Sequence, residues 1–117
     1  MTIILIIDNK VYTKNGVQAE FDVAPYIEPG SNRAMAPIRF IAEAFSASVV
    51  WEDEIKTGFI HLDGKSLSIA LNQPLPDNMG KAVIVRDRLF VPVRYVSEQL
   101  GAKVDWDANG RRVTITR

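Results

Sequence analysis

The sequence predicts an α+β fold in which twisted antiparallel sheet wraps two short helices. Three observations support that prediction. Turn dipeptides divide the chain into short strands, two segments instead carry apolar residues at helical spacing, and residues 32–60 match residues 87–115 at a constant offset of 55. We therefore expect one domain over 1–117, built from two hairpin–helix–hairpin units at about 1–62 and 63–117.

The internal match contains no gaps. Identical residues recur at these positions: Arg33 and Arg88, Pro37 and Pro92, Arg39 and Arg94, Glu43 and Glu98, Ala47 and Ala102, Val49 and Val104, Trp51 and Trp106, Ile60 and Ile115. A supersecondary unit duplicates mostly the residues that it needs for packing, whereas catalytic residues tend to occur once. The match therefore indicates architecture more strongly than chemistry.

Turn signals locate the strands. Asn15-Gly16 and Asp63-Gly64 are dipeptides preferred in two-residue type I′ hairpins, because both central positions need a positive φ. A third turn is expected at Asn109-Gly110. Strands are expected at 2–7, 10–14, 17–23, 33–36, 47–52, 56–62, 65–71, 82–85, 88–91, 102–107 and 111–116.

Two helices are expected, over 37–46 and 92–100. Each segment begins with a proline, which suits the first helical position because its missing N–H has no partner there anyway. Gly101 has the position of a residue that ends a helix in the left-handed conformation, and Ser46 occupies the same place in the first segment. Apolar residues follow the helical period in both: Ile38, Ile41, Ala42 and Phe45, then Val93, Val96 and Leu100. The residues 72–80, rich in proline and glycine, are expected to form the joining loop.

Strand alternation assigns the faces. Trp51 and Trp106 share the phase of the apolar residue two positions before them, so both are expected under a helix, in the core. Val50 stands where the second unit has Asp105 and therefore points outward. Phe59 and His61 share the face opposite Ile60, with His61 across from Ser66. We expect any contact with a ligand to use Val50, Phe59 and His61.

Composition excludes several classes of function. Fourteen basic residues balance fourteen acidic ones, which argues against a nucleic-acid or anionic-membrane partner bound through bulk charge. The apolar run at 3–7 is too short to span a bilayer and lacks the features of a signal peptide, so no membrane insertion is expected. Cysteine is absent, which removes disulfides, thiolate metal sites and a cysteine nucleophile.

No catalytic or metal-binding set is evident. His61 is the only histidine, whereas a copper or zinc site normally uses two or three imidazoles or thiolates. Asp105 and Asp107 share a strand face, but a calcium site normally needs a denser acidic loop. We therefore expect no metal, no cofactor and no enzymatic activity.

Arg39 and Arg94 lie in the first turn of the expected helices, where a positive charge opposes the helix dipole. The structural interpretation is an ion pair one turn along, with Glu43 or Glu98. Stacking on a tryptophan, or clamping of a carboxylate or phosphate ligand, are the alternatives.

The succession of Pro-apolar-Arg, a helix carrying glutamate, and Ala-x-Val-x-Trp-acidic resembles the copper amine oxidase N-terminal domain family, also called stalk domains. The matching signature residues are Pro37, Arg39, Glu43 and Trp51, then Pro92, Arg94, Glu98 and Trp106. The first unit departs from the pattern at Ala34, Ala36, Ser46 and Thr57-Gly58. The resemblance implies sheet wrapped around a helix and a non-catalytic appendage. It also implies that copper and the quinone cofactor belong to a separate catalytic domain.

From this resemblance we expect a structural or interaction module of a secreted or cell-envelope bacterial protein. Its partner would be a protein or a cell-wall or matrix component, and the sequence leaves the oligomeric state open. The alternative is a ligand-binding module for glycan or peptide that uses the outward sheet surface or an open sheet edge.

Overall fold

The computed structural model describes all 117 residues as three antiparallel sheets around two short helices. The helices are α1 (Ile38–Ala44) and α2 (Val93–Gln99), and 3₁₀ turns occur at η1 (Asp53–Ile55) and η2 (Pro76–Asn78). The strands are β1 (Thr2–Ile6), β2 (Val11–Lys14), β3 (Val17–Glu20), β4 (Tyr26–Glu28), β5 (Arg33–Pro37), β6 (Ser48–Glu52), β7 (Thr57–Leu62), β8 (Lys65–Ala70), β9 (Val83–Val85), β10 (Arg88–Pro92), β11 (Lys103–Asp107) and β12 (Arg112–Thr116).

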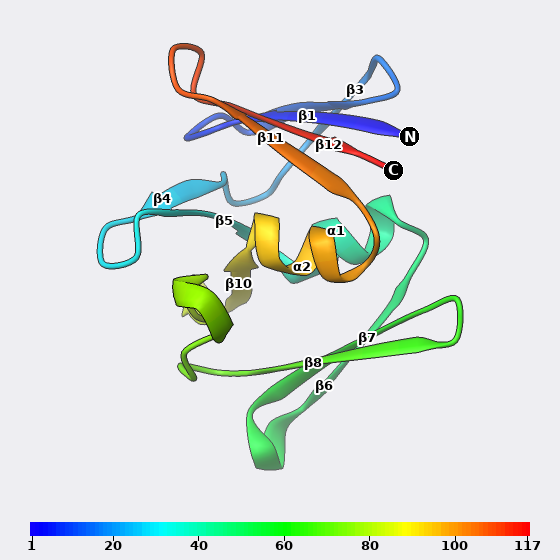
Figure 1. The fold of residues 1–117 in the computed structure, drawn as a ribbon, viewed down its shortest axis with the longest axis vertical. Helices are drawn as coiled ribbons and strands as arrows, with labels where there is room; N and C mark the ends of the chain where they lie inside the picture. The colour runs from blue at the N-terminus through cyan, green and yellow to red at the C-terminus, as the bar shows by residue number, and fades with distance from the viewer.

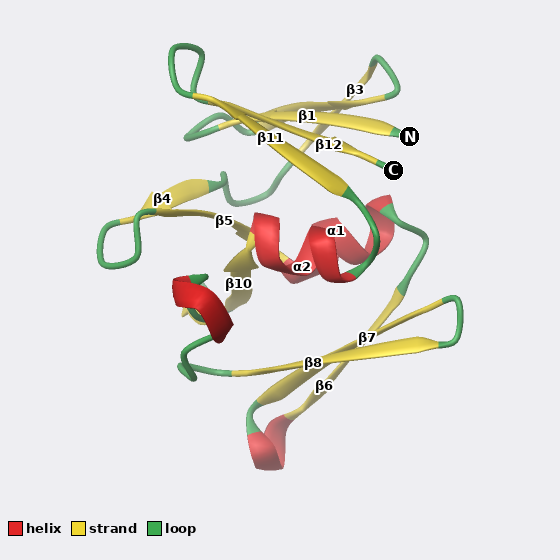
Figure 2. Cartoon of the chain, in the orientation of Figure 1, coloured by secondary structure: helices red, strands yellow, loops and turns green.

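The sheets enclose the helices from several sides. A five-stranded sheet of order β11-β12-β1-β2-β3 covers one side, and a three-stranded sheet of order β6-β7-β8 covers the opposite side. A four-stranded sheet, β4-β5-β10-β9, closes a third side, and α1 and α2 lie between the layers (Figure 1). Colouring by secondary structure shows how short the helices are beside the strands (Figure 2). The predicted α+β class agrees with this arrangement.

The five-stranded sheet joins the two ends of the chain. β1 pairs with β12, so that Ile3 lies opposite Ile115, and both side chains are fully buried. The terminal residues also meet, because the Met1 amino group donates to the Arg117 carbonyl oxygen at 2.7 Å. On the other side, β8 pairs with β7. Strands on either side of the expected boundary at residue 62 therefore pair with each other. The division of the chain into two units at that residue stays a prediction.

Eight elements form four pairs that begin at an offset of 55, and three of these pairs also end at that offset. β5, α1, β6 and β7 begin 55 residues before β10, α2, β11 and β12. β5 pairs with β10 in an antiparallel register that sets Ala36 opposite Val91. These two residues are themselves 55 positions apart, so the matching segments meet at equivalent positions in the middle of the four-stranded sheet.

The expected helix signals are present, with a shift at the start. Pro37 and Pro92 are N-cap residues with extended backbone, one position earlier than predicted, because each still belongs to its strand. Ser46 and Gly101 adopt positive φ angles of 57° and 88°. The next residue in each segment, Ala47 or Ala102, donates its N–H to a carbonyl five residues back, which closes the helix end as a Schellman motif.

The faces predicted for the helices are buried. Ile38, Ile41, Phe45, Val93, Val96 and Leu100 are all at most 7% exposed. Together with the inward residues of the five- and three-stranded sheets, they form one hydrophobic cluster.

The strand predicted over 17–23 was wrong at its end, since β3 stops at Glu20. The sequence also gave no indication of β4, which follows Pro25 and pairs with β5.

Candidate functional site

The outward face of the three-stranded sheet carries the predicted contact residues. Val50 lies opposite Phe59, and Phe59 lies opposite Ser68, so the three form a row across the sheet. Val50 is 47% exposed, and Phe59 is half-buried. His61 is exposed, and its Nδ1 lies 2.7 Å from the Ser66 hydroxyl, the neighbour expected from the hairpin register. The structure places these side chains as predicted, and their binding role stays a prediction.

The prediction that both tryptophans are core residues was wrong. Trp51 is 38% exposed and Trp106 is 44% exposed. The strand phase itself is as predicted, because Val104 on the face of Trp106 is 6% exposed and Val49 on the face of Trp51 is half-buried. Each helix has only seven residues, however, and therefore extends about 10 Å. Each tryptophan lies two residues, roughly 7 Å, beyond Val49 or Val104 along its strand. Each indole ring therefore projects past the helix and forms the wall of a groove.

The two arginines differ. Arg94 Nη1 lies 3.3 Å from Glu98 Oε2, the i,i+4 ion pair expected for a structural role. Arg39 has no ion pair within 4 Å, and neither has Glu43, so this half of the prediction was wrong. Neither arginine stacks on a tryptophan; the cation–π contact in the chain is Arg117 over Phe45. Arg39 is exposed and faces an open groove.

That groove, which we call the α1 groove, has a volume of about 920 Å³. It runs between α1, the edge strand β6, the β9–β10 hairpin and the β2–β3 hairpin. Its lining residues are Tyr12, Glu20, Phe21, Asp22, Pro37, Ile38, Arg39, Phe40, Glu43, Val49, Val50, Trp51, Asp53, Lys56, Gly58, Leu71, Ile84, Asp87, Arg88 and Leu89.

A second groove, the α2 groove, has a volume of about 270 Å³. Its lining residues are Ile27, Asn32, Arg33, Ala34, Met79, Pro92, Val93, Arg94, Val104, Trp106 and Val113. Apart from Ile27 and Met79, each of these has a counterpart 55 positions away in the lining of the α1 groove. The two grooves therefore occupy equivalent places beside the two helices.

The floor of the α1 groove depends on Gly58. A Cβ atom there would lie 3.1 Å from Leu89 Cδ2 and 3.3 Å from Ile38 Cδ1, which is tighter than ordinary packing. The α2 groove has Val113 and Ala34 at the positions of Gly58 and Leu89. The large and small side chains have thus exchanged places between the two grooves.

Two ion pairs border the α1 groove. Arg88 Nε donates to Asp22 Oδ2 at 2.7 Å, and this bond lowers the pKa of Asp22 below its ordinary value. Lys56 Nζ lies 2.7 Å from Asp53 Oδ1, which also accepts the Trp51 indole N–H at 3.3 Å. These two hydrogen bonds lower the pKa of Asp53. The carboxylate of Asp53 therefore links Lys56 to the Trp51 ring at the border of the groove.

The carboxylates inside the α1 groove are less constrained. Glu20, Glu43 and Asp87 make no ion pair, and neither does Arg39. The pKa of Tyr12 is raised, first by burial and second by the negative charge of Glu43. Counting the paired groups, five acidic and three basic residues give the lining a net charge of −2. The α2 groove carries Arg33 and Arg94 and no acidic residue.

Sequence reasoning missed the α1 groove as a site. Its walls include Tyr12, Ile84 and Arg88, which belong to elements far apart in the chain. Two differences between the matching segments were available as a signal: Gly58 where Val113 stands, and Val50 where Asp105 stands.

No group of three or more histidine, cysteine, aspartate or glutamate side chains has the geometry of a metal site. None of the helices has the length and apolar character needed to cross a membrane.

Comparison with known proteins identifies the family. The family model described as copper amine oxidase N-terminal domain matches residues 13–115. Searches of curated proteins and of solved structures found no match. In copper amine oxidases this N-terminal domain is a non-catalytic accessory domain. The family match covers both helices and the strands that flank them, and the chain therefore belongs to the copper amine oxidase N-terminal domain family.

Proposed function

We propose that this chain is a non-catalytic interaction module of a secreted or cell-envelope bacterial protein. The family match supports the accessory role, because the corresponding domain of copper amine oxidases is non-catalytic. The observation that supports an interaction role is the α1 groove, where Trp51, Val50 and Ile84 remain 38–48% exposed beside unpaired charges. Large side chains exposed together mark contact surfaces more often than isolated ones do. The partner would be a protein or a wall or matrix component.

We also propose that the two matching segments are structural repeats. Their elements begin at a common offset of 55, and Ala36 pairs with its own counterpart, Val91. Such a pairing is what an approximate two-fold axis through the centre of the four-stranded sheet would produce. An experimental structure in which 33–60 and 88–115 failed to superpose would contradict the repeat.

The interaction role is tested by retention on envelope material. The labelled domain is incubated with isolated bacterial envelope fractions, washed, and competed with unlabelled domain. We expect saturable retention that the competitor removes. A domain that passes through every fraction without retention would reduce the role to that of a spacer.

The non-catalytic role is tested separately. The folded domain is supplied with copper and a primary amine, and hydrogen peroxide is measured. We expect no peroxide above the level of copper alone, and the same result for His61→Ala, because one imidazole makes a poor copper site. Peroxide formation that disappears in His61→Ala would contradict the proposal.

A second candidate function is binding of a ligand, glycan or peptide, on the outward sheet face. It is favoured by the row of Val50 and Phe59, which leaves apolar surface exposed beside His61. Phe59→Ser is the direct test, since the side chain lies on the outside of the sheet. Loss of a captured ligand with an unchanged melting curve would support this function.

A further inference from the structure

We propose that the edge of β6 and the α1 groove bind an extended peptide segment by strand addition. The segment alternates basic side chains, which enter the groove, with apolar side chains, which pack beside Val50. This inference rests on the proposed function, since it names the partner class and the site of that interaction module.

The first support is the geometry of the edge. β6 is the outermost strand of its sheet and pairs only with β7. Apart from that pairing, the backbone of Ser48–Glu52 makes no hydrogen bond within the chain. Val49, Val50 and Trp51 all line the groove, although neighbouring residues of a strand point to opposite faces. The groove therefore runs along the free edge, where an added strand would lie.

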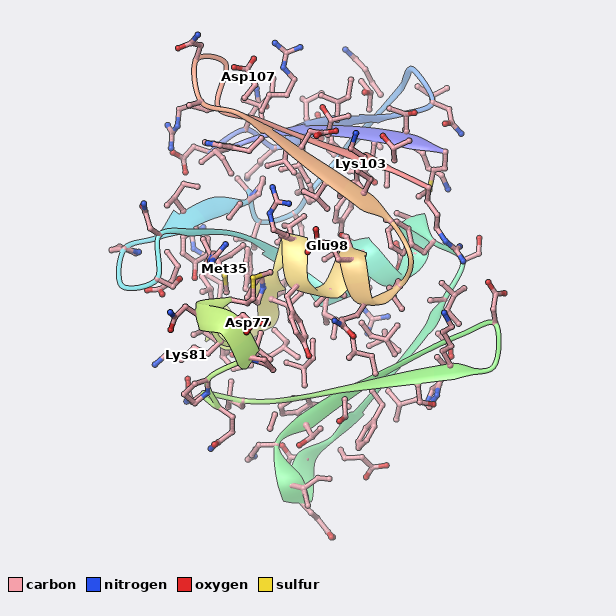
Figure 3. All side chains as sticks on the ribbon, in the orientation of Figure 1. Met35, Asp77, Lys81, Glu98, Lys103 and Asp107 are labelled. Carbon is pink, nitrogen blue, oxygen red and sulfur yellow. The ribbon has the colours of Figure 1, made fainter.

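The second support is the absence of edge protection. Natural sheets discourage strand addition with charged side chains on an edge strand. The equivalent edge strand β11 carries Lys103, Asp105 and Asp107 on its outward face. Lys103 and Asp107 lie toward its two ends, above Glu98 of α2 (Figure 3). β6 has the apolar Val50 at the position of Asp105, so its centre lacks this protection.

The third support is charge. The lining of the α1 groove has a net charge of −2, and its unpaired carboxylates, Glu20, Glu43 and Asp87, lie on three different elements around it. Lysine or arginine side chains entering from an added strand would pair with them. The same charge disfavours a second copy of this chain, because two acidic grooves would face each other across joined β6 edges.

The fourth support is the Trp51 wall. Its indole N–H donates to Asp53, and the ring lines the groove while remaining 38% exposed. A guanidinium over an indole face is attracted by the ring, and its methylene stem packs against apolar surface. On the outer face of the added strand, apolar side chains would extend the row formed by Val50 and Phe59. The period of two follows from the alternation of a strand.

The test uses three labelled heptapeptides. One alternates arginine and valine, one has the same composition with all arginines before all valines, and one alternates glutamate and valine. Fluorescence anisotropy should show saturable binding of the alternating basic peptide, at least about tenfold weaker binding of the block peptide, and none of the acidic one. Equal affinity for the two basic peptides would overturn the proposal, since charge alone would then explain the binding.

Val50→Lys is the principal variant, because it places a charge at the centre of β6, where the apolar side chains of the segment would pack. We expect about a tenfold loss of affinity for the alternating peptide. Ser68→Lys is the matched control, since Ser68 lies in the same row on the far strand of the same sheet. Unchanged affinity in Val50→Lys, or an equal loss in Ser68→Lys, would overturn the proposal.

Glu43→Gln is the second variant, and it tests the peptide site if Val50→Lys fails to fold cooperatively. It removes one unpaired carboxylate of the groove and leaves β6 intact. We expect roughly a threefold loss of affinity, with a weaker dependence on salt. Amide exchange read by NMR should slow in Ser48–Glu52 when the peptide is added, and slowing confined to β3 or β11 would contradict the site.

Two further results separate this inference from the proposed function. If the domain is retained on envelope fractions but binds no peptide, the interaction role stands and the peptide site is wrong. If sedimentation shows a dimer that Val50→Lys abolishes, in a protein that binds no peptide, the edge joins two copies and the peptide proposal is overturned.

Discussion

The α1 groove and the α2 groove occupy equivalent places beside the two helices, yet their volumes are about 920 Å³ and about 270 Å³. The α2 groove is bordered by Met79 from the loop at 72–80, and Arg33 donates to the Asn78 carbonyl of that loop at 2.9 Å. No residue of 72–80 lines the α1 groove, which instead extends to Tyr12 and Glu20 of the β2–β3 hairpin. The surroundings of a helix therefore decide whether the surface beside it is filled or left open.

Charge separates the same two regions. Beside α2, Arg94 pairs with Glu98, and the outward face of β11 is charged. Beside α1, Arg39 and Glu43 stay unpaired, and Val50 is apolar. The α2 side has the character of a structural surface, and the α1 side retains the exposed apolar and unpaired charged groups expected of a binding surface.

The largest expected effect comes from Gly58→Val, which introduces the side chain that the α2 groove has at Val113. The new side chain would press on Leu89 and Ile38, whose atoms leave 3.1 Å and 3.3 Å to a Cβ. We expect a loss of roughly 1–3 kcal/mol in the free energy of unfolding, as for other overpacked sites. Urea denaturation measures it.

The same substitution tests the exchange of large and small side chains. In a double variant with Leu89→Ala, which reproduces Val113 and Ala34, much of the loss should be recovered. A double-mutant cycle gives this coupling directly. Strict additivity of the two single effects would show that Gly58 and Leu89 do not constrain each other. The exchange of large and small side chains would then not explain the difference between the two grooves.

The tryptophans come next. Trp51→Ala and Trp106→Ala should each lower stability by about 1–2 kcal/mol, because a half-exposed ring buries only part of its surface. The value is well below the 3–5 kcal/mol typical of a core tryptophan. Trp51→Ala should also weaken binding of the alternating basic peptide, and Trp106→Ala should not. Thermal or urea melting measures both variants. A stability loss of about 3–5 kcal/mol in either one would show that its ring is a core residue.

The two helices also differ at one buried position, which is Ser97 in α2 and Ala42 in α1. The Ser97 hydroxyl is fully buried and has no hydrogen-bond partner. Ser97→Ala should raise the free energy of unfolding by about 1 kcal/mol, because an unsatisfied buried hydroxyl is costly. The reverse change, Ala42→Ser, is the control and should lower it. A stability loss in Ser97→Ala would reveal a partner for the hydroxyl.

The positions of most elements could be predicted from the sequence. The hairpin dipeptides fixed two turns, and both adopt the positive φ values that they require: 51° and 81° at Asn15 and Gly16, 51° and 79° at Asp63 and Gly64. The apolar spacing of 38–45 and 93–100 identified the helical faces. These signals are local, and short-range chemistry determines them.

The rest depended on contacts between distant residues. Strand phase placed Trp51 on the inward face, but its burial depended on where α1 ends relative to β6. The pairing of β1 with β12 joins the two ends of the chain, and no local signal specifies it. The α1 groove likewise combines Tyr12, Trp51 and Ile84 from three regions of the sequence. Of the candidate residues, Val50 was found in advance because an apolar residue interrupts a charged pattern.

A smaller effect is expected at the helix ends. Ser46 and Gly101 are equivalent, and both have positive φ, which strains a residue with a side chain but not glycine. Ser46→Gly should stabilise the domain by about 0.5 kcal/mol or slightly more, and Gly101→Ser should destabilise it by a similar amount. Thermal melting measures both. Changes of the same sign would mean that the two helix ends are not equivalent in energy.

The smallest effect concerns acid. The pKa values of Asp22 and Asp53 are lowered by hydrogen bonds from Arg88 and Lys56, beside the α1 groove. Because each folded pKa lies below the unfolded one, the unfolded chain binds more protons in that interval. The stabilisation is therefore complete above the unfolded pKa of ~4 and is lost as the pH falls through the folded pKa. Melting temperatures from about pH 7 to about pH 2 should fall less steeply in Asp22→Asn than in the parent. Asp105→Asn, which removes the same charge from β11, is the matched control, and an equal change of slope in the two variants would show that the acid response does not originate at the α1 groove.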